Sequence, residues 1–334
     1  MNAVGLHING VGAVSPAGWS SADLVRVIRE GEPLPSADCE RPGAGRDWSC
    51  PVRLVPPAPP DKVVRGPRFR RASAISRYAV AACMEALQDA GYDPAAPPPR
   101  LGILFCMMNG CVKYTGRFYQ EVLDNPSQAS PLIFPETVFN APASHIAAML
   151  GVDGAVSTII GQANCIMEAL DMAAVWIHSG VIDHCLVVSA EEGDWLSAEA
   201  LSYYHTGQIA AEGAGALLVS ASGPGPRLQS ITGPLPYHTW RQRGSLLPAL
   251  TAETGSILID DCCGVAKQDR DELRAWSGTT WAARHSPKRL IGETMGTSSA
   301  LQLVLATCEA RDKKARVVVS MPGTNSAAYA CAVE

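Results

Sequence analysis

The chain has 334 residues, of which 47% are hydrophobic and 18% are charged, and its formal net charge is −5. This composition indicates a globular chain with a large buried core and excludes an intrinsically disordered one. Because lysine and arginine form no broad basic field, we expect no nucleic-acid partner.

The N-terminus and the cysteines both favour a cytoplasmic protein. The first residues lack the basic start and the apolar run of a signal peptide, and the eleven cysteines show no regular spacing. No stretch approaches the roughly 18 uninterrupted apolar residues that a membrane-spanning helix requires. We therefore expect a reducing, cytoplasmic setting and no membrane partner.

Strands and helices alternate along the first part of the chain. Apolar runs predict strands, and apolar residues at spacings of three and four predict helices. The proline-rich segment 31–67 has no sustained apolar period, so we expect a surface loop there. The alternation predicts an α/β layering. The predicted strands are 4–11, 101–106 and 182–189, and the predicted helices are 21–30, 70–91, 140–150 and 165–179.

The second part of the chain repeats this pattern more sparsely. It contains predicted strands at 215–220, 256–260 and 316–320 and a predicted helix at 298–310. The order of these elements is compatible with two similar α/β halves, although no short-period repeat is present. Length does not decide the number of domains, because one large α/β unit can be as long as two average domains.

Four segments occur in an order that resembles the β-ketoacyl synthases of the thiolase superfamily over nearly the whole chain. They are 11–18, 130–135 with Asn140, 211–215 and 322–325. They are similar to the family's opening strand and turn, dimer-interface segment, glycine-rich strand entry and C-terminal loop. The resemblance implies an α/β, thiolase-like layered fold, a single unit over 1–334 with two related α/β halves. The halves would be about 1–200 and a shortened 201–334, since only about 40 residues separate Val219 from Asp260.

The resemblance places Ala163 where the family has its nucleophilic cysteine. That cysteine lies at a helix N-terminus, which favours a thiolate and an oxyanion, but a methyl group cannot be acylated. Gln162 precedes this position, and Cys165 follows it by two residues. Two residues along a helix correspond to a rotation of about 200°, so Cys165 is expected to face away from the family's thiol position. Cys165 is therefore either an unconventional nucleophile or a small buried packing residue.

The two histidines that complete the family's site correspond to Asp261 and Glu293. In the family they donate hydrogen bonds to the thioester oxygen and promote malonyl decarboxylation. An ionised carboxylate only accepts hydrogen bonds, so both substitutions oppose condensation. Lys288 matches the family's lysine, which predicts an ion pair between Lys288 and Glu293. The alternative is that both carboxylates are solvated on the surface.

This pattern is most similar to the chain-length factors, the non-condensing partners of type II polyketide ketosynthases. These factors typically carry glutamine at the nucleophile position, whereas Gln162 lies one residue early. Among such systems we favour the aryl-polyene and other highly reducing type II classes over the aromatic class. The resemblance implies a heterodimer with a catalytic ketosynthase, in which Ile133, Phe134 and Met321 limit the length of the acyl chain. It implies no cofactor beyond the phosphopantetheine that an acyl carrier protein presents.

A basic run precedes the second predicted helix. Arg68, Arg70 and Arg71 can receive the acidic helix of an acyl carrier protein, because guanidinium groups pair well with carboxylates and with phosphate. The alternative is a solvated basic helix start.

Other enzyme classes find less support in the sequence. The run 260–263, Asp-Asp-Cys-Cys, contains metal-binding residue types, but neighbouring strand side chains point to opposite faces, so we predict no metal site. No Gly-x-Ser-x-Gly elbow indicates a hydrolase. We therefore predict a catalytically silent subunit, and the alternative is a condensing or acyl-transfer enzyme that uses Cys165.

Overall fold

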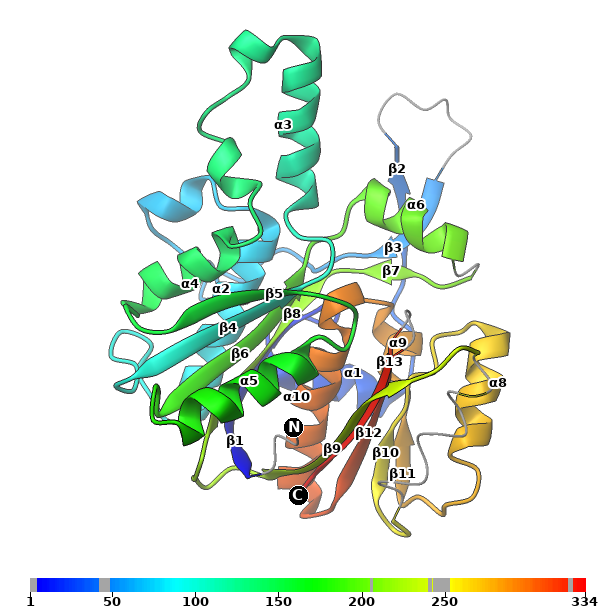
Figure 1. Cartoon of the computed structure of the whole chain (residues 1–334). Helices are drawn as coiled ribbons and strands as arrows, with labels where there is room; N and C mark the ends of the chain where they lie inside the picture. Colours follow the sequence, from blue (N-terminus) through cyan, green and yellow to red (C-terminus); the bar gives the residue numbers. More distant parts are fainter. Residues whose placement is uncertain (1–4, 42–48, 205–206, 240–241, 243–252, 324–326) are drawn as a thin grey trace.

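A computed structural model describes residues 5–41, 49–204, 207–239, 242, 253–323 and 327–334, and Figure 1 shows the arrangement of their elements. Ten strands form one continuous sheet with two sets of five in the same order. Each set has three parallel strands followed by two antiparallel ones. The first set is β5 (Val156–Ile160), β4 (Leu101–Met107), β6 (His184–Glu191), β8 (Gly213–Ser220) and β1 (Leu6–Val14). The second set is β11 (Ala283–His285), β10 (Ile257–Ile259), β12 (Val317–Pro322), β13 (Ala327–Val333) and β9 (Arg227–Pro236).

The two sets meet where β1 pairs with β9 over Leu6 and His7. The matching strand order confirms a thiolase-like α/β fold with two related halves. The second set contains five strands, as the first set does. A division near residue 200 and a shortened second half stay predictions.

Helices fill three layers around the two sets of strands. Helices α5 (Ile166–His178) and α10 (Ser298–Lys313) share one buried apolar cluster with strands of both sets, so they lie between them. Helices α2 (Ala74–Asp89) and α4 (Ala141–Leu150) cover the outer face of the first set. Helix α8 (Ala266–Ala275) covers the outer face of the second. The alternation of side chains along β4 explains why helices cover both faces of the sheet. Leu104 and Cys106 face the central layer, while Phe105 faces α2.

Local sequence signals explain the helices that were predicted well. Helix α1 (Ser21–Glu30) confirms its prediction at both ends, because the Ser20 side chain accepts from the Asp23 amide and Gly31 adopts a φ of 77°. Helices α4, α5 and α10 are likewise confirmed within a few residues. Helix α2 begins at Ala74 instead of Arg70, because a 3₁₀ turn, Pro67–Arg70, precedes it.

The prediction of a loop throughout 31–67 is wrong. Strands β2 (Ala37–Glu40) and β3 (Ser49–Arg53) pair with each other, and β3 pairs with β7 (Ala210–Ala211). The partner β7 lies far away in the sequence, so no local apolar period reveals this three-stranded sheet. Helix α6 (Trp195–Tyr204) packs beside it.

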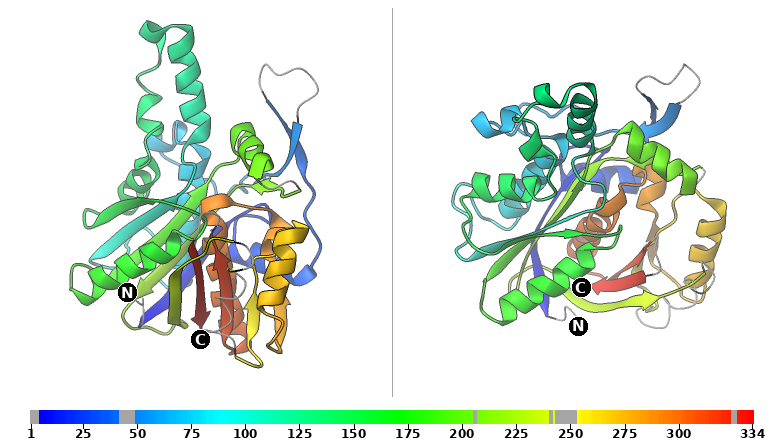
Figure 2. Two further views of the ribbon diagram at one scale, coloured as in Figure 1. Left: turned by 45° about the vertical axis from the view of Figure 1, so that its right-hand side comes forward. Right: turned by 45° about the horizontal axis from the view of Figure 1, so that its top comes forward.

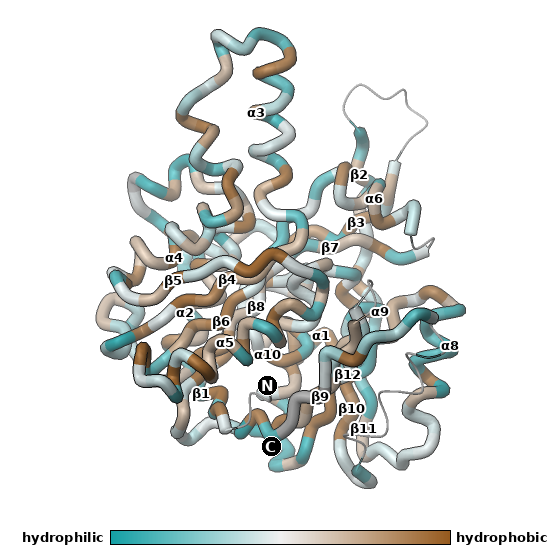
Figure 3. The backbone as a smooth tube through the Cα atoms, viewed as in Figure 1, coloured by the Kyte–Doolittle hydropathy of each residue, from teal (hydrophilic) through white to brown (hydrophobic). Residues whose placement is uncertain are grey.

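Residues 112–136, called the arm below, project from the body of the molecule. The arm contains α3 (Val112–Asp124) and two 3₁₀ turns, Pro126–Gln128 and Phe134–Glu136. Figure 2 shows in two further views that α3 stands away from the sheet, and none of its residues is buried. Apolar residues are nevertheless found along it, as the hydropathy colouring in Figure 3 shows. Within the described parts of the chain, no helix has the length and apolar character needed to cross a membrane.

Candidate functional site

Ala163 lies in the turn that joins β5 to α5. The turn is tied to both halves of the molecule, because the Gly161 amide donates to the Met107 carbonyl at 3.0 Å and the Asn164 side chain donates to the Met321 carbonyl at 3.2 Å. Asn164 also donates to the Ala327 carbonyl at 3.0 Å. Ala163 is 6% exposed and offers only a methyl group. The position that the resemblance gives to the nucleophile therefore has none.

Cys165 is buried beneath this turn. It is 1% exposed, belongs to the central apolar cluster, and is the residue that immediately precedes the first residue of α5. A β-carbon added to Gly161 would come within 2.6 Å of the Cys165 β-carbon, so Gly161 lies directly against it. The interpretation of Cys165 as a buried packing residue agrees with this position. A substrate could reach its thiol only if the turn moved.

Asp261, Lys288 and Glu293 come together as a buried ionic group, called the carboxylate–lysine cluster below. The Lys288 Nζ lies 2.7 Å from the Asp261 Oδ1 and 2.9 Å from the Glu293 Oε2. Each of the three residues is only 7% exposed. The predicted ion pair of Lys288 with Glu293 is confirmed, and the alternative of two solvated surface carboxylates is wrong. The sequence did not reveal that Asp261 shares the same ammonium group.

The backbone around Glu293 fixes its carboxylate in place. The Glu293 amide donates to the Ile209 carbonyl at 2.8 Å, and the Ala211 amide donates to the Glu293 carbonyl at 2.8 Å, so this residue is clamped to β7. Its carboxylate accepts from the Gln208 side chain at 2.8 Å, from the Met295 amide at 3.0 Å and from the Ser298 hydroxyl. In all of these contacts the oxygens of the Glu293 side chain are the acceptors.

The charge state of the cluster follows from its geometry. Burial alone would lower the pKa of Lys288, but Asp261 and Glu293 outweigh that effect and raise it. The ammonium group therefore stays protonated and cannot act as a base or a nucleophile. With two carboxylates and one ammonium group, the cluster does not attract an anionic malonyl group.

Two further buried carboxylates at the end of β6 were not singled out from the sequence. Glu191 accepts from the amides of Met108 and Asn109, the latter at 3.2 Å, and burial raises the pKa of Glu191 to about 8. Glu192 accepts from the Lys113 amide at 2.8 Å. Together they hold the base of the arm. In the sequence, the two consecutive glutamates at the end of an apolar run could have indicated these buried carboxylates.

The predicted tunnel residues lie on different elements. Phe134 is 54% exposed on the arm, where its ring lies 5.5 Å from that of Phe118. Ile133, its neighbour, is buried, and Met321 is fully buried in the central apolar cluster at the end of β12. Only Phe134 therefore presents a large side chain to an incoming molecule.

The predicted carrier-protein residues do form an exposed basic surface. Arg68, Arg70 and Arg71 are exposed on and after the 3₁₀ turn that precedes α2. Phe69 is 5% exposed between them and packs against His145, with a ring distance of 5.5 Å. This anchor directs the neighbouring arginines outward.

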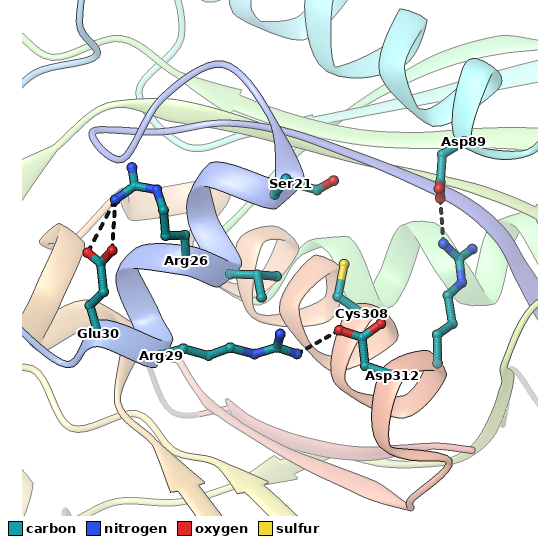
Figure 4. A pocket seen from close by; sticks show the side chains of 10 residues that line it. Ser21, Arg26, Arg29, Glu30, Asp89, Cys308 and Asp312 are labelled. Atoms are coloured by element: carbon teal, nitrogen blue, oxygen red, sulfur yellow. Dashed lines mark hydrogen bonds and ion pairs between the residues drawn. The ribbon is translucent and has the colours of Figure 1, made fainter.

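A groove between α1 and α10 has a volume of about 760 Å³ (Figure 4). Its three arginines are already paired with carboxylates of the same chain. Arg26 pairs with Glu30, Arg29 with Asp312 and Arg311 with Asp89. The groove contains none of the site residues described above and offers no unpaired arginine to a ligand.

Known proteins share this architecture. The family model of the β-ketoacyl synthase N-terminal domain matches residues 6–222. The fold is similar to the ishigamide ketosynthase/chain length factor, with a TM-score of 0.80, 19% identity and 98% of both chains covered. It is also similar to the ketosynthase ApeO in complex with its chain length factor ApeC from Xenorhabdus doucetiae, with a TM-score of 0.78, 14% identity, and 99% of this chain and 98% of that chain covered.

A third similar structure is the AntDE:AntF complex, a type II polyketide synthase acyl-carrier protein with its ketosynthase bound to the hexaketide. Its TM-score is 0.77, with 15% identity and 98% of both chains covered. None of the curated proteins matches the chain.

Proposed function

Because the chain belongs to the β-ketoacyl synthase family, we propose that it is a non-condensing, chain-length-factor-like subunit that pairs with an active ketosynthase. The carboxylate–lysine cluster carries this proposal. It consists of two buried carboxylates that share one ammonium group, and the resemblance assigns both carboxylates to the positions of the family's two histidine donors.

Condensation needs a nucleophile and stabilisation of negative charge. Ala163 cannot be acylated, and a fixed carboxylate disfavours both a malonyl carboxylate and a developing enolate, because the charges have the same sign. A pathway in which the partner supplies all three catalytic groups avoids both problems. This chain would then contribute only a surface that binds the partner and a shape that limits the tunnel.

The exposed apolar surface supports an association with a partner. Tyr119, Leu123 and Phe134 on the arm are 63%, 60% and 54% exposed. Among the strands that the structure describes, β5 pairs with β4 alone, at one end of the ten-stranded sheet, and its Ile160 is 55% exposed. Exposed apolar surface and an unpaired strand edge both favour contact with another chain.

The ligand assignments follow from that association. The exposed ring of Phe134 would extend into the acyl tunnel of the partner, while Ile133 and Met321 would shape it from within this chain. Arg68, Arg70 and Arg71 would bind an acidic carrier protein, whose phosphopantetheine presents the acyl chain. The named complexes of similar fold contain a ketosynthase with a chain length factor or with a carrier protein. An aryl-polyene pathway, as opposed to another type II polyketide pathway, is part of the proposal.

The test is reconstitution with a ketosynthase encoded beside this chain. Each subunit is purified alone and together, then supplied with acyl and malonyl carrier-protein thioesters. We expect no turnover from this chain alone, a co-eluting complex with the partner, and turnover that is lost when the partner's catalytic cysteine is replaced. Turnover by the isolated chain that Cys165→Ala abolishes would establish the alternative of a self-sufficient condensing enzyme.

A further inference from the structure

Two cysteines face each other across the hairpin of β2 and β3. Cys39 and Cys50 are direct partners in the antiparallel register. Directly opposite residues point to the same face, with β-carbons about 4.5–5.5 Å apart, whereas a disulfide needs about 3.5–4.5 Å. Strand β2 is the outer strand of its sheet, so a small shift of β2 can close this difference. From this geometry we propose that Cys39 and Cys50 are a thiol-modification site that forms a reversible disulfide.

Exposure separates this pair from the other cysteines. Cys39, Cys50 and Cys308 are partly exposed, while the remaining eight are buried. A small oxidant can therefore reach both members of the pair. Cys308 lies on α10 and is also partly exposed, but burial raises its pKa to about 12 and it has no cysteine opposite it in a strand, so it serves as an unpaired control.

The pair lies against residues that adjoin the carboxylate–lysine cluster. Cys39 and Cys50 pack on a small apolar cluster that includes Ala210 and Met295. Ala210 forms a bridge with Glu293, and Met295 follows Glu293 by two residues. A disulfide between β2 and β3 would thus fix the hairpin against the segment that carries Glu293.

The hairpin is also attached to α6. Arg41, which follows β2, lies 3.3 Å from the Glu199 carboxylate and 5.1 Å from the centre of the Trp195 ring. These contacts attach the end of β2 to α6, beside the strand pair that carries the two cysteines. Burial and the nearby Asp194 raise the pKa of Cys39, so its thiolate becomes more abundant as the pH rises.

The oxidant in this proposal is a small-molecule disulfide such as oxidised glutathione. The thiolate of one cysteine attacks a sulfur of the small disulfide, whose S–S bond breaks and releases one small thiol. The thiolate of the other cysteine then attacks the mixed disulfide and releases the second small thiol. Two protein thiols are oxidised, one small disulfide is reduced to two thiols, and the two protons pass to the leaving thiolates.

The experiment uses the full folded chain in a buffer of reduced and oxidised glutathione at mildly alkaline pH. Free thiols are then blocked and the peptides mapped by mass spectrometry. We expect a cross-linked peptide that joins Cys39 to Cys50 with the loss of two hydrogen atoms, and its disappearance on reduction. Cys308→Ser should leave this product unchanged. In Cys39→Ser, Cys50 should retain glutathione instead.

Three outcomes would overturn the proposal. They are no oxidation of the folded wild-type chain, persistent glutathione on both cysteines without an internal bond, and cross-links that involve Cys308. If the variants give too little protein, a second measurement needs only the wild-type chain. Oxidation should slow amide hydrogen exchange in residues 37–40 of the wild type, and equal exchange before and after oxidation would also contradict the proposal.

Discussion

The arm and the carboxylate–lysine cluster place their side chains in opposite ways. On the arm, Tyr119 and Leu123 are 63% and 60% exposed although they are apolar or aromatic. In the cluster, three charged residues are 7% exposed each. The cost of burying the charges is offset within the chain by close pairing, whereas the described residues leave Tyr119 and Leu123 uncovered. The comparison separates a region whose charges are paired within the chain from one that, under the proposed function, would contact a partner.

The largest expected effect comes from removing the shared ammonium group. Lys288→Met leaves two carboxylates buried without a counter-charge, which should lower the free energy of unfolding by about 3–5 kcal/mol. Chemical denaturation measures this change. The matched control is Lys267→Met on the exposed face of α8, which should change stability by less than about 0.5 kcal/mol. If both substitutions lowered the free energy of unfolding equally, Lys288 would not be needed to neutralise the two buried carboxylates.

The second prediction tests the buried carboxylate that holds the base of the arm. Because the pKa of Glu191 is about 8 in the folded chain and ordinarily 4.5, folding takes up a proton between these values. This contribution to stability is fully present below about pH 4.5 and is lost as the pH rises through about 8.

The measurement is the free energy of unfolding between about pH 5 and pH 9. In Glu191→Gln the decrease with pH should become shallower, since the amide does not titrate. Glu32→Gln, at an exposed position, should keep the slope of the wild type. A slope that Glu191→Gln leaves unchanged would assign the pH dependence to other buried acids.

The third prediction concerns the arm. Tyr119→Ala with Leu123→Ala should leave the stability of the isolated chain nearly unchanged, because both side chains are exposed there. Affinity for the ketosynthase should fall by about 1–2 kcal/mol, as expected for aromatic and apolar contacts at an interface. Titration calorimetry measures the affinity, and Tyr204→Ala on α6 is an exposed aromatic control. If the control weakens binding as much as the arm variant does, the partner does not seat on the arm.

The smallest effect is expected for product length. Phe134→Ala opens space for additional methylene groups, and burial of each is worth about 0.8 kcal/mol. Longer products should therefore appear by mass spectrometry at an unchanged total turnover. An unaltered product profile in Phe134→Ala, Ile133→Ala and Met321→Ala would show that these residues do not set the length.

The fold was predictable where its signals are local. Helix α1 has its capping residues Ser20 and Gly31 in the sequence itself, so both ends were correct. Strands β2 and β3 were missed because their third partner, β7, lies about 150 residues further along the chain. Helix α3 was not predicted. None of its residues is buried, so its apolar side chains do not face a core of the same chain.

The site was predictable in its residue types but not in its full geometry. Spacing relative to the family singled out Ala163, Asp261 and Glu293, whose correspondence to the catalytic positions stays a prediction. The predicted ion pair of Lys288 with Glu293 was correct. That Asp261 binds the same ammonium group depends on how the end of β10 lies beside α9 (Pro287–Ile291), which no local pattern encodes. The burial of Met321 likewise depends on tertiary packing, because the central apolar cluster that contains it is formed by strands of both sets.

The repeated order of strands has a consequence for any redesign of the site. The turn before α5, which carries Ala163, and the segment before α10, which carries Lys288 and Glu293, occupy equivalent places in the two halves. Each half thus contributes one loop. Under the proposed function, Ala163→Cys would supply a thiol in the first loop but leave the Glu293 carboxylate in the second, so this single substitution would not create a condensing site. Both loops would have to be rebuilt together.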